Sequence, residues 1–365
     1  MWYAVIELIG IFLFAITSLF SLRKLAVVVG LVDKPNARKH HKGVIPLVGG
    51  ISILLSLLFF ISINYQSLPL GGFYATSIVI LVAVGVWDDK CDISFKIRLF
   101  VQVCLSLAMI YIANVDLHTL GNLFNLGTVQ LGWLSVIVTI LAVVGAINAF
   151  NMVDGIDGLL GGLSIVSFAS IGLLGFLNGH DRLAYFCLVF IVCIVPYVLF
   201  NLGFIGRKRK VFMGDAGSML IGYSVIFFIL STTQNTDPAA IAFRPVTALW
   251  FIAIPLIDMG VIMVRRIRRG DSPFKPDREH LHHICQRIGL SSRQSLSLIC
   301  ALALVYSAIG IVGELFDIPE VMMLGLFLLM ACGHFYMMSH SWKLTIFIRT
   351  IFSINKKSKL QEVVN

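Results

Sequence analysis

The chain has 365 residues, of which 58% are hydrophobic and only 13% carry a charge. Soluble domains contain about 25% charged residues, so a water-soluble fold is excluded. A membrane helix takes about 20 apolar residues, and the hydrophobic residues suffice for roughly ten or eleven such helices. The composition therefore predicts a protein that crosses the membrane many times. The meaning of the net charge of +9 depends on where the charges lie.

Eleven apolar segments follow one another along the chain. Backbone amides find no hydrogen-bond partners in lipid, so each segment is expected to form a helix. The segments lie at about 4–22, 44–62, 70–87, 97–114, 129–150, 159–178, 183–205, 217–233, 243–264, 295–314 and 319–338. The first one lacks a small-residue cleavage site, which favours a retained span over a removed signal peptide. We predict an all-α, polytopic integral membrane protein with about eleven transmembrane helices.

The basic residues predict how the chain is oriented in the membrane. All but two of the 28 Lys and Arg fall on alternate loops and on the C-terminal tail, the exceptions being Arg182 and Arg244. Basic loops stay in the cytoplasm. We therefore expect the N-terminus outside and the C-terminus in the cytoplasm. We also expect residues 1–340 to form a single transmembrane domain, and residues 341–365 to form a basic cytoplasmic tail that lies along anionic membrane lipid. The charge marks topology and gives no sign of nucleic acid.

Ten carboxylates lie on the predicted cytoplasmic loops beside these cations. The positive-inside rule does not account for acidic residues, so another reason is needed for their position. They are Asp33, Asp88, Asp89, Asp92, Asp154, Asp157, Asp215, Asp271, Asp277 and Glu279.

The first acidic motif is the pair Asp88 and Asp89, directly after the third apolar segment. Adjacent carboxylates repel each other unless a cation or a proton lies between them. The pair therefore indicates a metal ligand or a general base with a raised pKa. The alternative is a solvated loop that ends the helix.

A second motif lies between the fifth and sixth segments, where Asn148, Asn151, Asp154 and Asp157 recur every three residues. In a helical turn neighbouring members of such a series lie on one side. Their oxygen atoms suit a hard cation, and the two glycines of the same loop allow the backbone to approach an anion. The alternative is a series of N-caps for the sixth helix.

A third motif precedes the eighth segment. Four consecutive cations at 207–210 are followed by Gly-Asp-Ala-Gly-Ser at 214–218. A helix N-terminus beside cations is a suitable phosphate site. Asp215 would repel a phosphate there unless it held a cation that bridges to it. The alternative is a topological charge block followed by a helix cap.

The fourth motif contains His280, His282 and His283 beside a basic run. Such histidines bind zinc, relay protons or contact phosphate, and the missing cysteine framework argues against a closed zinc site. Phosphate contacts or acid–base chemistry are favoured over a solvated polar loop. Asp258, within the ninth segment, is a functional candidate because carboxylates are rare in membrane helices. It could instead pair with an arginine or cap a helix broken by proline.

Together these motifs favour Mg²⁺ that is held by a few side chains and shared with substrate phosphates. The chemistry would be phosphoryl transfer from a soluble, doubly phosphorylated donor to an acceptor in the membrane. A transporter of anions is the competing class. Transport needs polar groups at mid-depth in the bilayer. In this chain the ionisable residues gather at one face of the membrane, and only Asp258 lies deeper within a segment.

At these motifs the sequence resembles the polyprenyl-phosphate N-acetylhexosamine-1-phosphate transferases. The resemblance extends from about residue 20 to residue 340. The motifs that carry it are Asp33-Lys34-Pro35-Asn36, Ile45-Pro46-Leu47-Val48-Gly49-Gly50, Asp88-Asp89, the segments 148–158 and 212–218, and His280-Leu281-His282-His283.

The resemblance implies transfer of GlcNAc-1-phosphate from UDP-GlcNAc to undecaprenyl phosphate, with release of UMP, at the cytoplasmic face of the bacterial inner membrane. The domain 1–340 would be catalytic, with Mg²⁺, or alternatively Mn²⁺, as cofactor. The product would prime a lipid-linked surface polysaccharide such as O-antigen or enterobacterial common antigen. A sibling enzyme for another UDP-N-acetylhexosamine, such as the MurNAc-pentapeptide donor, is the alternative.

The resemblance also implies residue roles. Asp215 would be the principal metal ligand and Asn151 a second one. Asp88 and Asp89 would be the acidic pair near the metal, with Asp88 as base or nucleophile. The remaining implied site residues are Asp154 and Asp157 at the nucleotide, Phe212 stacked on uracil, His280, His282 and His283 by the diphosphate or sugar, and Asn148, Lys34 and Arg265 as further substrate contacts.

Overall fold

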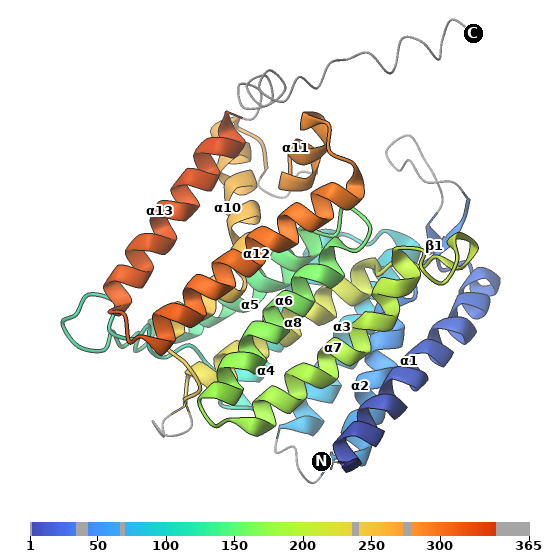
Figure 1. Ribbon diagram of the computed structural model, residues 1–365, viewed down its shortest axis with the longest axis horizontal. Coiled ribbons are helices and arrows are strands. Elements are labelled where there is room, and N and C mark those ends of the chain that lie inside the picture. The colour runs from blue at the N-terminus through green and yellow to red at the C-terminus, as the bar shows by residue number, and fades with distance from the viewer. Residues whose placement is uncertain (1, 34–42, 66–69, 236–240, 273–278, 341–365) are drawn as a thin grey trace, which may run out of the picture.

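The computed structural model describes residues 2–33, 43–65, 70–235, 241–272 and 279–340 (Figure 1). Helices dominate, which confirms the all-α prediction. The described strands are one short antiparallel pair, β1 (Val32–Asp33) with β2 (Ile45–Pro46). The α-helices are α1 (Trp2–Val29), α2 (Gly49–Ile63), α3 (Gly71–Cys91), α4 (Phe95–Tyr111), α5 (Leu134–Met152), α6 (Leu159–Leu177), α7 (Asp181–Asn201), α8 (Gly214–Thr233), α9 (Pro245–Phe251), α10 (Ala253–Arg268), α11 (Leu281–Ile288), α12 (Ser292–Leu315) and α13 (Glu320–Ser339).

Each of the eleven apolar segments coincides with a helix or, for the ninth, with a pair of helices. By length and composition, eight helices of the described chain suffice to cross a membrane, or nine if the bent pair α9–α10 counts as one span. Helices α2 and α4, with 15 and 17 residues, fall short of the usual length. The chain is thus a polytopic membrane protein with eight or nine candidate spans.

The ninth predicted segment is not one continuous helix. Helices α9 and α10 meet at an angle of 81° around Ile252. Pro255 lies in the first turn of α10. A proline ring clashes with the carbonyl group four residues earlier, which here belongs to Phe251, so one helix cannot run through this point. The proline therefore begins α10 in a new direction.

Helix α8 forms the centre of the bundle. Of the residues in its most apolar stretch, 83% are buried, and it packs extensively against α3 and α5. Two glycines bring neighbouring helices against its first turn. A Cβ atom on Gly85 of α3 would lie 2.3 Å from the Ala216 Cα atom, and one on Gly50 of α2 would lie 2.3 Å from the Gly217 nitrogen. Only glycine permits these approaches, so the start of α8 is held tightly by α2 and α3.

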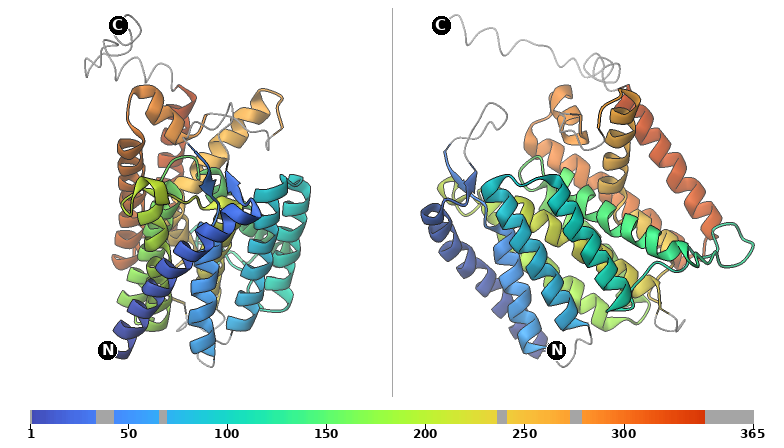
Figure 2. Two further views of the ribbon diagram at one scale, coloured as in Figure 1. Left: turned by 90° about the vertical axis from the view of Figure 1, so that its right-hand side faces the viewer. Right: turned by 180° about the vertical axis from the view of Figure 1, so that it is seen from behind.

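A short backbone pairing joins the segment after β2 to the segment before α8. The Phe212 amide donates to the Pro46 carbonyl (2.9 Å), and the Gly49 amide donates to the Phe212 carbonyl (2.9 Å). Two motifs far apart in the sequence therefore lie side by side. Figures 1 and 2 show β1 in the upper half of the molecule, where α11 also lies, with the N-terminus at the lower end.

Candidate active site

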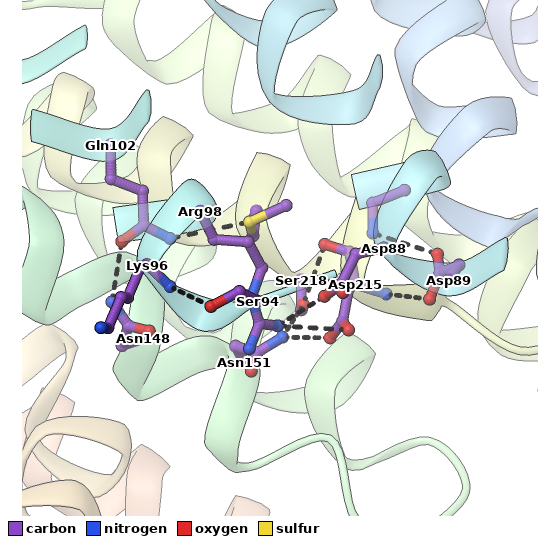
Figure 3. Close-up of polar contacts among 12 residues, drawn as sticks. Asp88, Asp89, Ser94, Lys96, Arg98, Gln102, Asn148, Asn151, Asp215 and Ser218 are labelled. Atoms are coloured by element: carbon purple, nitrogen blue, oxygen red, sulfur yellow. Dashed lines mark hydrogen bonds and ion pairs between the residues drawn. The ribbon is translucent and has the colours of Figure 1, made fainter. Parts of the chain in front are cut away.

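The acidic motifs meet where the first turn of α8 contacts the last turns of α3 and α5 (Figure 3). The sequence predicted that Asp88 and Asp89 follow the third helix. Helix α3 continues to Cys91, so both residues lie in its last turn instead. Helix α5 continues to Met152 and therefore includes Asn151. Helical backbone fixes all three side chains relative to α8.

Arg98 of α4 joins the two carboxylates that face each other across this junction. Its Nη1 atom lies 2.7 Å from the Asp88 Oδ2 atom and 3.3 Å from the Asp215 Oδ2 atom. Asp88 is buried, whereas 35% of the Asp215 side chain is exposed. The pair therefore attracts positive charge, and Asp215 is the member open to a ligand.

Asn151 completes this cluster from α5. Its Nδ2 atom donates to the Asp215 Oδ1 atom (2.5 Å) and to the Ser218 hydroxyl (2.7 Å). Because the amide nitrogen is engaged, the carbonyl oxygen of Asn151 is the atom left for a cation. The structure thus brings Asp88, Asp215 and Asn151 together, as the sequence predicted.

Asp89 has a different environment from Asp88. Its carboxylate accepts hydrogen bonds from the backbone amides of Asp215 (2.8 Å) and Ala216 (3.3 Å). These amides belong to the first turn of α8, where a carboxylate satisfies free donors and complements the helix dipole. Gly214 has φ of +75°, and a Cβ atom there would lie 2.3 Å from Asp89 Oδ2. Asp89 therefore holds Asp215 in place.

Asn148 does not join the acidic centre. Its Nδ2 atom donates to the Gln102 side chain (2.9 Å) and to the Val144 carbonyl (2.8 Å). Gln102 in turn donates to the Met219 sulfur (3.6 Å). The four residues that recur at every third position, from Asn148 to Asp157, therefore do not form one group in the structure. Two members end α5, while Asp154 and Asp157 lie in the following turn because α5 stops at Met152.

The turn after α5 contacts the basic segment before α8. The Lys210 Nζ atom lies 2.5 Å from the Asp157 Oδ2 atom and 5.1 Å from the centre of the Phe212 ring. Asp154 is exposed in the same turn. Asp157 and Phe212, both predicted at the nucleotide, therefore belong to one cluster through Lys210.

The histidine motif is anchored by Asp258, which is buried in α10. The Asp258 carboxylate lies 2.7 Å from the His280 Nδ1 atom and accepts a hydrogen bond from the Leu281 amide (2.9 Å). It therefore fixes the His280 ring and the start of α11. The sequence had left open that Asp258 pairs with an arginine. The structure shows such a pairing role, but the partner is His280.

His282 is buried and connects α11 to the turn after α5. Its Nε2 atom has no hydrogen-bond partner among the described residues, and a Cβ atom on Gly155 would lie 2.1 Å from it. Burial is the main cause that lowers the pKa of His282 to about 3; the nearby rings of His283 and His280 contribute in the same direction, and Asp258 acts in the opposite one. The His282 ring is therefore neutral and packs against Gly155.

Arg265 anchors the segment that precedes α11. Its Nη2 atom lies 3.0 Å from the Glu279 Oε2 atom, and its Nη1 atom donates to the Met338 carbonyl (3.2 Å). Arg269 binds the other Glu279 oxygen (2.9 Å). The structure thus gives Arg265 a place beside the histidine motif. Lys34 and the predicted tail 341–365 lie outside the described residues.

Sequence reasoning missed Arg98, which it counted only as a topological charge. A signal was present, because Arg98 and Lys96 lie in the first turn of α4, just after the N-cap Ser94. Cations are unfavourable at a helix N-terminus. Their position there indicates an acidic partner nearby.

The cluster fits Mg²⁺ of the kind that shares its coordination with substrate. Among the described residues there is no group of three or more His, Cys, Asp or Glu side chains that could hold a metal. Mg²⁺ needs only one or two carboxylates and completes its shell with water and phosphate. Asp215 and the Asn151 carbonyl oxygen fit this demand, and the positive Arg98 already shows that this position favours a cation.

Comparison with known proteins shows which enzymes the chain resembles. The sequence model of glycosyl transferase family 4 matches residues 71–233, from α3 to α8. Three curated relatives carry the name undecaprenyl-phosphate alpha-N-acetylglucosaminyl 1-phosphate transferase. They are from Yersinia pestis (50% identical, covering 94% of this chain and 93% of the relative), Escherichia coli strain K12 (48%, 94% and 94%) and Pasteurella multocida (46%, 94% and 96%).

The helical membrane fold and the acidic site define a membrane-bound phosphotransferase. The chain belongs to glycosyl transferase family 4, among the polyprenyl-phosphate N-acetylhexosamine-1-phosphate transferases. This confirms the resemblance of the motifs and identifies the protein as an enzyme. The matched region 71–233 includes Asp88, Asn151 and Asp215, whereas the histidine motif lies beyond it.

Proposed function

We propose that the protein transfers GlcNAc-1-phosphate from UDP-GlcNAc to undecaprenyl phosphate and releases UMP. The observation that carries this proposal is the identity of 46–50% over nearly the whole chain to enzymes named for this acceptor and sugar. The acidic centre at the ends of apolar helices supports it, since a lipid phosphate and a soluble donor can meet there. The product would prime a surface polysaccharide such as O-antigen or enterobacterial common antigen.

In this reaction an oxygen of the acceptor phosphate attacks the phosphorus that carries GlcNAc. The bond from that phosphorus to the bridging oxygen breaks, and UMP leaves with the electron pair. Negative charge has to be neutralised at both phosphates. When bound, Mg²⁺ or Mn²⁺ would supply this neutralisation, held by Asp215 and Asn151. Arg98, 3.3 Å from Asp215, adds a permanent positive charge on the protein side.

Asp88 is the buried one of the two carboxylates that contact Arg98. Its position suits a proton acceptor or a nucleophile. Its ion pair with Arg98 keeps one oxygen directed toward Asp215. As a base it would take a proton from the acceptor phosphate. As a nucleophile it would form an acyl phosphate with the sugar phosphate and expel UMP before the acceptor binds. Release of UMP without acceptor separates the two roles.

The donor would extend from this centre toward the cluster of Asp157, Lys210 and Phe212. Phe212 offers an aromatic surface for the base, and Asp157 offers hydrogen-bond acceptors. On the other side, His280 is held by Asp258 and would contact the diphosphate or the sugar. The neutral His282 serves to hold α11 against the turn that contains Gly155.

For the membrane, we propose eleven spans, with α2 and α4 as short spans and α9–α10 as a broken one. The acidic centre would face the cytoplasm of a bacterial inner membrane. Single cysteines on a cysteine-free background test this. Leu126→Cys, in the exposed α4–α5 loop, should react with an impermeant maleimide in intact spheroplasts, and Lys208→Cys should react only after permeabilisation. The reverse pattern would contradict the orientation.

A panel of donors tests substrate choice. Purified protein with undecaprenyl phosphate and Mg²⁺ is incubated with UDP-GlcNAc, UDP-GalNAc or UDP-MurNAc-pentapeptide, and lipid product and UMP are quantified. We expect lipid-linked product with UDP-GlcNAc. Product only with the MurNAc-pentapeptide donor would assign the protein to the sibling activity. Uptake of a phosphorylated solute into proteoliposomes without turnover would favour a transporter.

A further inference from the structure

A cavity of about 580 Å³ lies at the opposite end of the bundle from the acidic centre. It is enclosed by the C-terminal half of α2, the start of α3, the first half of α7 and the end of α8. Asp88 and Asp215 lie at the other ends of α3 and α8, which have 21 and 20 residues. The lining residues of these helices are 12 to 17 residues from Asp88 and Asp215, so at 1.5 Å per residue roughly 18–26 Å separates the two sites. The cavity is therefore no part of the active site.

The walls of this cavity are apolar and largely aromatic. Phe60, Tyr74, Phe190 and Phe227 are among the lining residues, and all four are buried. The volume lies within the usual 300–1,000 Å³ of ligand pockets. A lining of this kind lacks the hydrogen-bonding groups that a sugar or a nucleotide requires, so the chemistry favours a hydrocarbon chain.

The rim of the cavity is polar and is formed by the first residues of α7. Arg182 is exposed and makes no hydrogen bond or ion pair with any described residue. Asp181 is its neighbour, but adjacent residues on a helix point in different directions and do not face each other. Asp181 lies in the first turn of α7 and offsets the positive end of the helix dipole there, so the positive charge of the rim is that of the Arg182 side chain.

The other arginine of this end is fully engaged. The Arg244 guanidinium binds Glu314 (3.0 Å) and donates to the carbonyls of Gly313 and Ile318 (2.9 Å each). Arg182 differs from Arg244, because Arg182 lies beside an apolar cavity and has no partner among the described residues. A cation at the mouth of a hydrocarbon-lined cavity complements an amphiphile with an anionic head.

We propose that this cavity binds an acyl chain of an anionic phospholipid, with the lipid phosphate at Arg182. The phospholipid would come from the membrane leaflet opposite the acidic centre. The phosphate at Arg182 is not that of the polyprenyl acceptor, because the acceptor phosphate has to reach Asp215 at the other end of α8. The bound chain fills the space between the pairs α2–α7 and α3–α8 and thereby supports the central helix.

Photo-crosslinking tests the proposal without relying on sugar-phosphate transfer. The protein is placed in phosphatidylcholine nanodiscs with a small fraction of phosphatidylglycerol that carries a diazirine at the end of one acyl chain. Labelled peptides are mapped by mass spectrometry. We expect the label to be concentrated on residues 57–61, 183–190 and 227–232. Ser231→Phe, which fills the cavity from α8, should abolish this label, whereas Ser62→Phe, an exposed change at the same end, should leave it intact.

A second pair of variants tests the headgroup. One arginine near a membrane surface contributes about 1 kcal/mol to binding anionic lipid, so Arg182→Gln should lower labelling by phosphatidylglycerol about fivefold. Arg182→Lys should restore it. A phosphatidylcholine probe should label the cavity weakly in every variant.

Equal labelling of the cavity residues and of the exposed face of α1 would overturn the proposal. So would a label that Ser231→Phe leaves unchanged, or preferential cavity labelling by a polyprenyl-phosphate probe. If Ser231→Phe fails to fold, the comparison of Arg182→Gln with Arg182→Lys still decides, because an unchanged label in both would exclude the anionic headgroup.

Discussion

Arg98 contacts both Asp88 and Asp215, so positive charge is favoured at this cluster of carboxylates. Replacing Asp215 by Asn removes the exposed ligand charge of this cluster. We expect turnover to fall by on the order of 100-fold or more, and the Mg²⁺ concentration for half-maximal rate to rise. Initial rates over a series of Mg²⁺ concentrations measure both effects.

Asp92→Asn is the matched control, because Asp92 is exposed at the end of α3 and has a φ of 51°, which asparagine tolerates. It should behave like the wild type. A normal rate and normal Mg²⁺ dependence in Asp215→Asn would refute the metal role.

Asp89 differs from its neighbour because both of its oxygens bind backbone amides of α8. Asparagine also caps helices, so Asp89→Asn should retain most of the thermal stability and part of the activity. Asp89→Ala should lose about 1 kcal/mol of stability together with activity. Thermal unfolding and transfer rates measure the two. Full stability with no activity in Asp89→Asn would instead indicate that the charge takes part in the chemistry.

His282 predicts a pH dependence of stability. Its pKa is lowered to about 3 in the folded protein and is near 6.5 when unfolded. Between these values the unfolded chain binds the extra proton, so stability falls as the pH falls below 6.5. From pH 7 to pH 5 this amounts to about 2 kcal/mol. His282→Phe should lose less thermal stability over this range than the wild type. An identical pH dependence in the two proteins would contradict the lowered pKa of His282.

The packing of α3 against α8 sets the geometry of the acidic centre. Gly85→Ala would place a methyl group 2.3 Å from the Ala216 Cα atom, so the helices must separate. Overpacking of this kind costs about 1–3 kcal/mol. We expect lower thermal stability and a larger loss of activity than stability alone explains, because Asp88 moves away from Asp215. Gly72→Ala, on the same helix with no contact closer than 3.8 Å, is the control. Equal activity in both variants would contradict this role of Gly85.

The positions of the helices could be predicted because lipid requires apolar, hydrogen-bonded segments. Helix ends and breaks were harder, since α3 continues through polar Asp88 and Asp89, and Pro255 divides the ninth segment. The acidic residues were found from sequence, but not their partners. Asp89 binds amides 126 and 127 residues away, and Arg98 reaches Asp215 over 117 residues. Such contacts arise only when the helices pack.

Over the whole molecule, α8 connects two regions with different chemistry. Its first turn carries Asp215 among cations and carboxylates, and its last turns line the apolar cavity. The basic residues that mark one end of the bundle thus surround the site of phosphate chemistry, while the opposite end has Arg182 as the described cation free to meet an anionic lipid.

Transfer from UDP-GlcNAc labelled at its β-phosphate tests the central claim most directly. Sugar-phosphate transfer moves that phosphorus to the lipid. With undecaprenyl phosphate and Mg²⁺, we predict that the label enters the lipid fraction, that an equal amount of unlabelled UMP is released, and that Asp215→Asn does neither. Label recovered in UDP would show transfer of the sugar alone. Label in water-soluble GlcNAc-1-phosphate would show hydrolysis, and either result would contradict the proposed reaction.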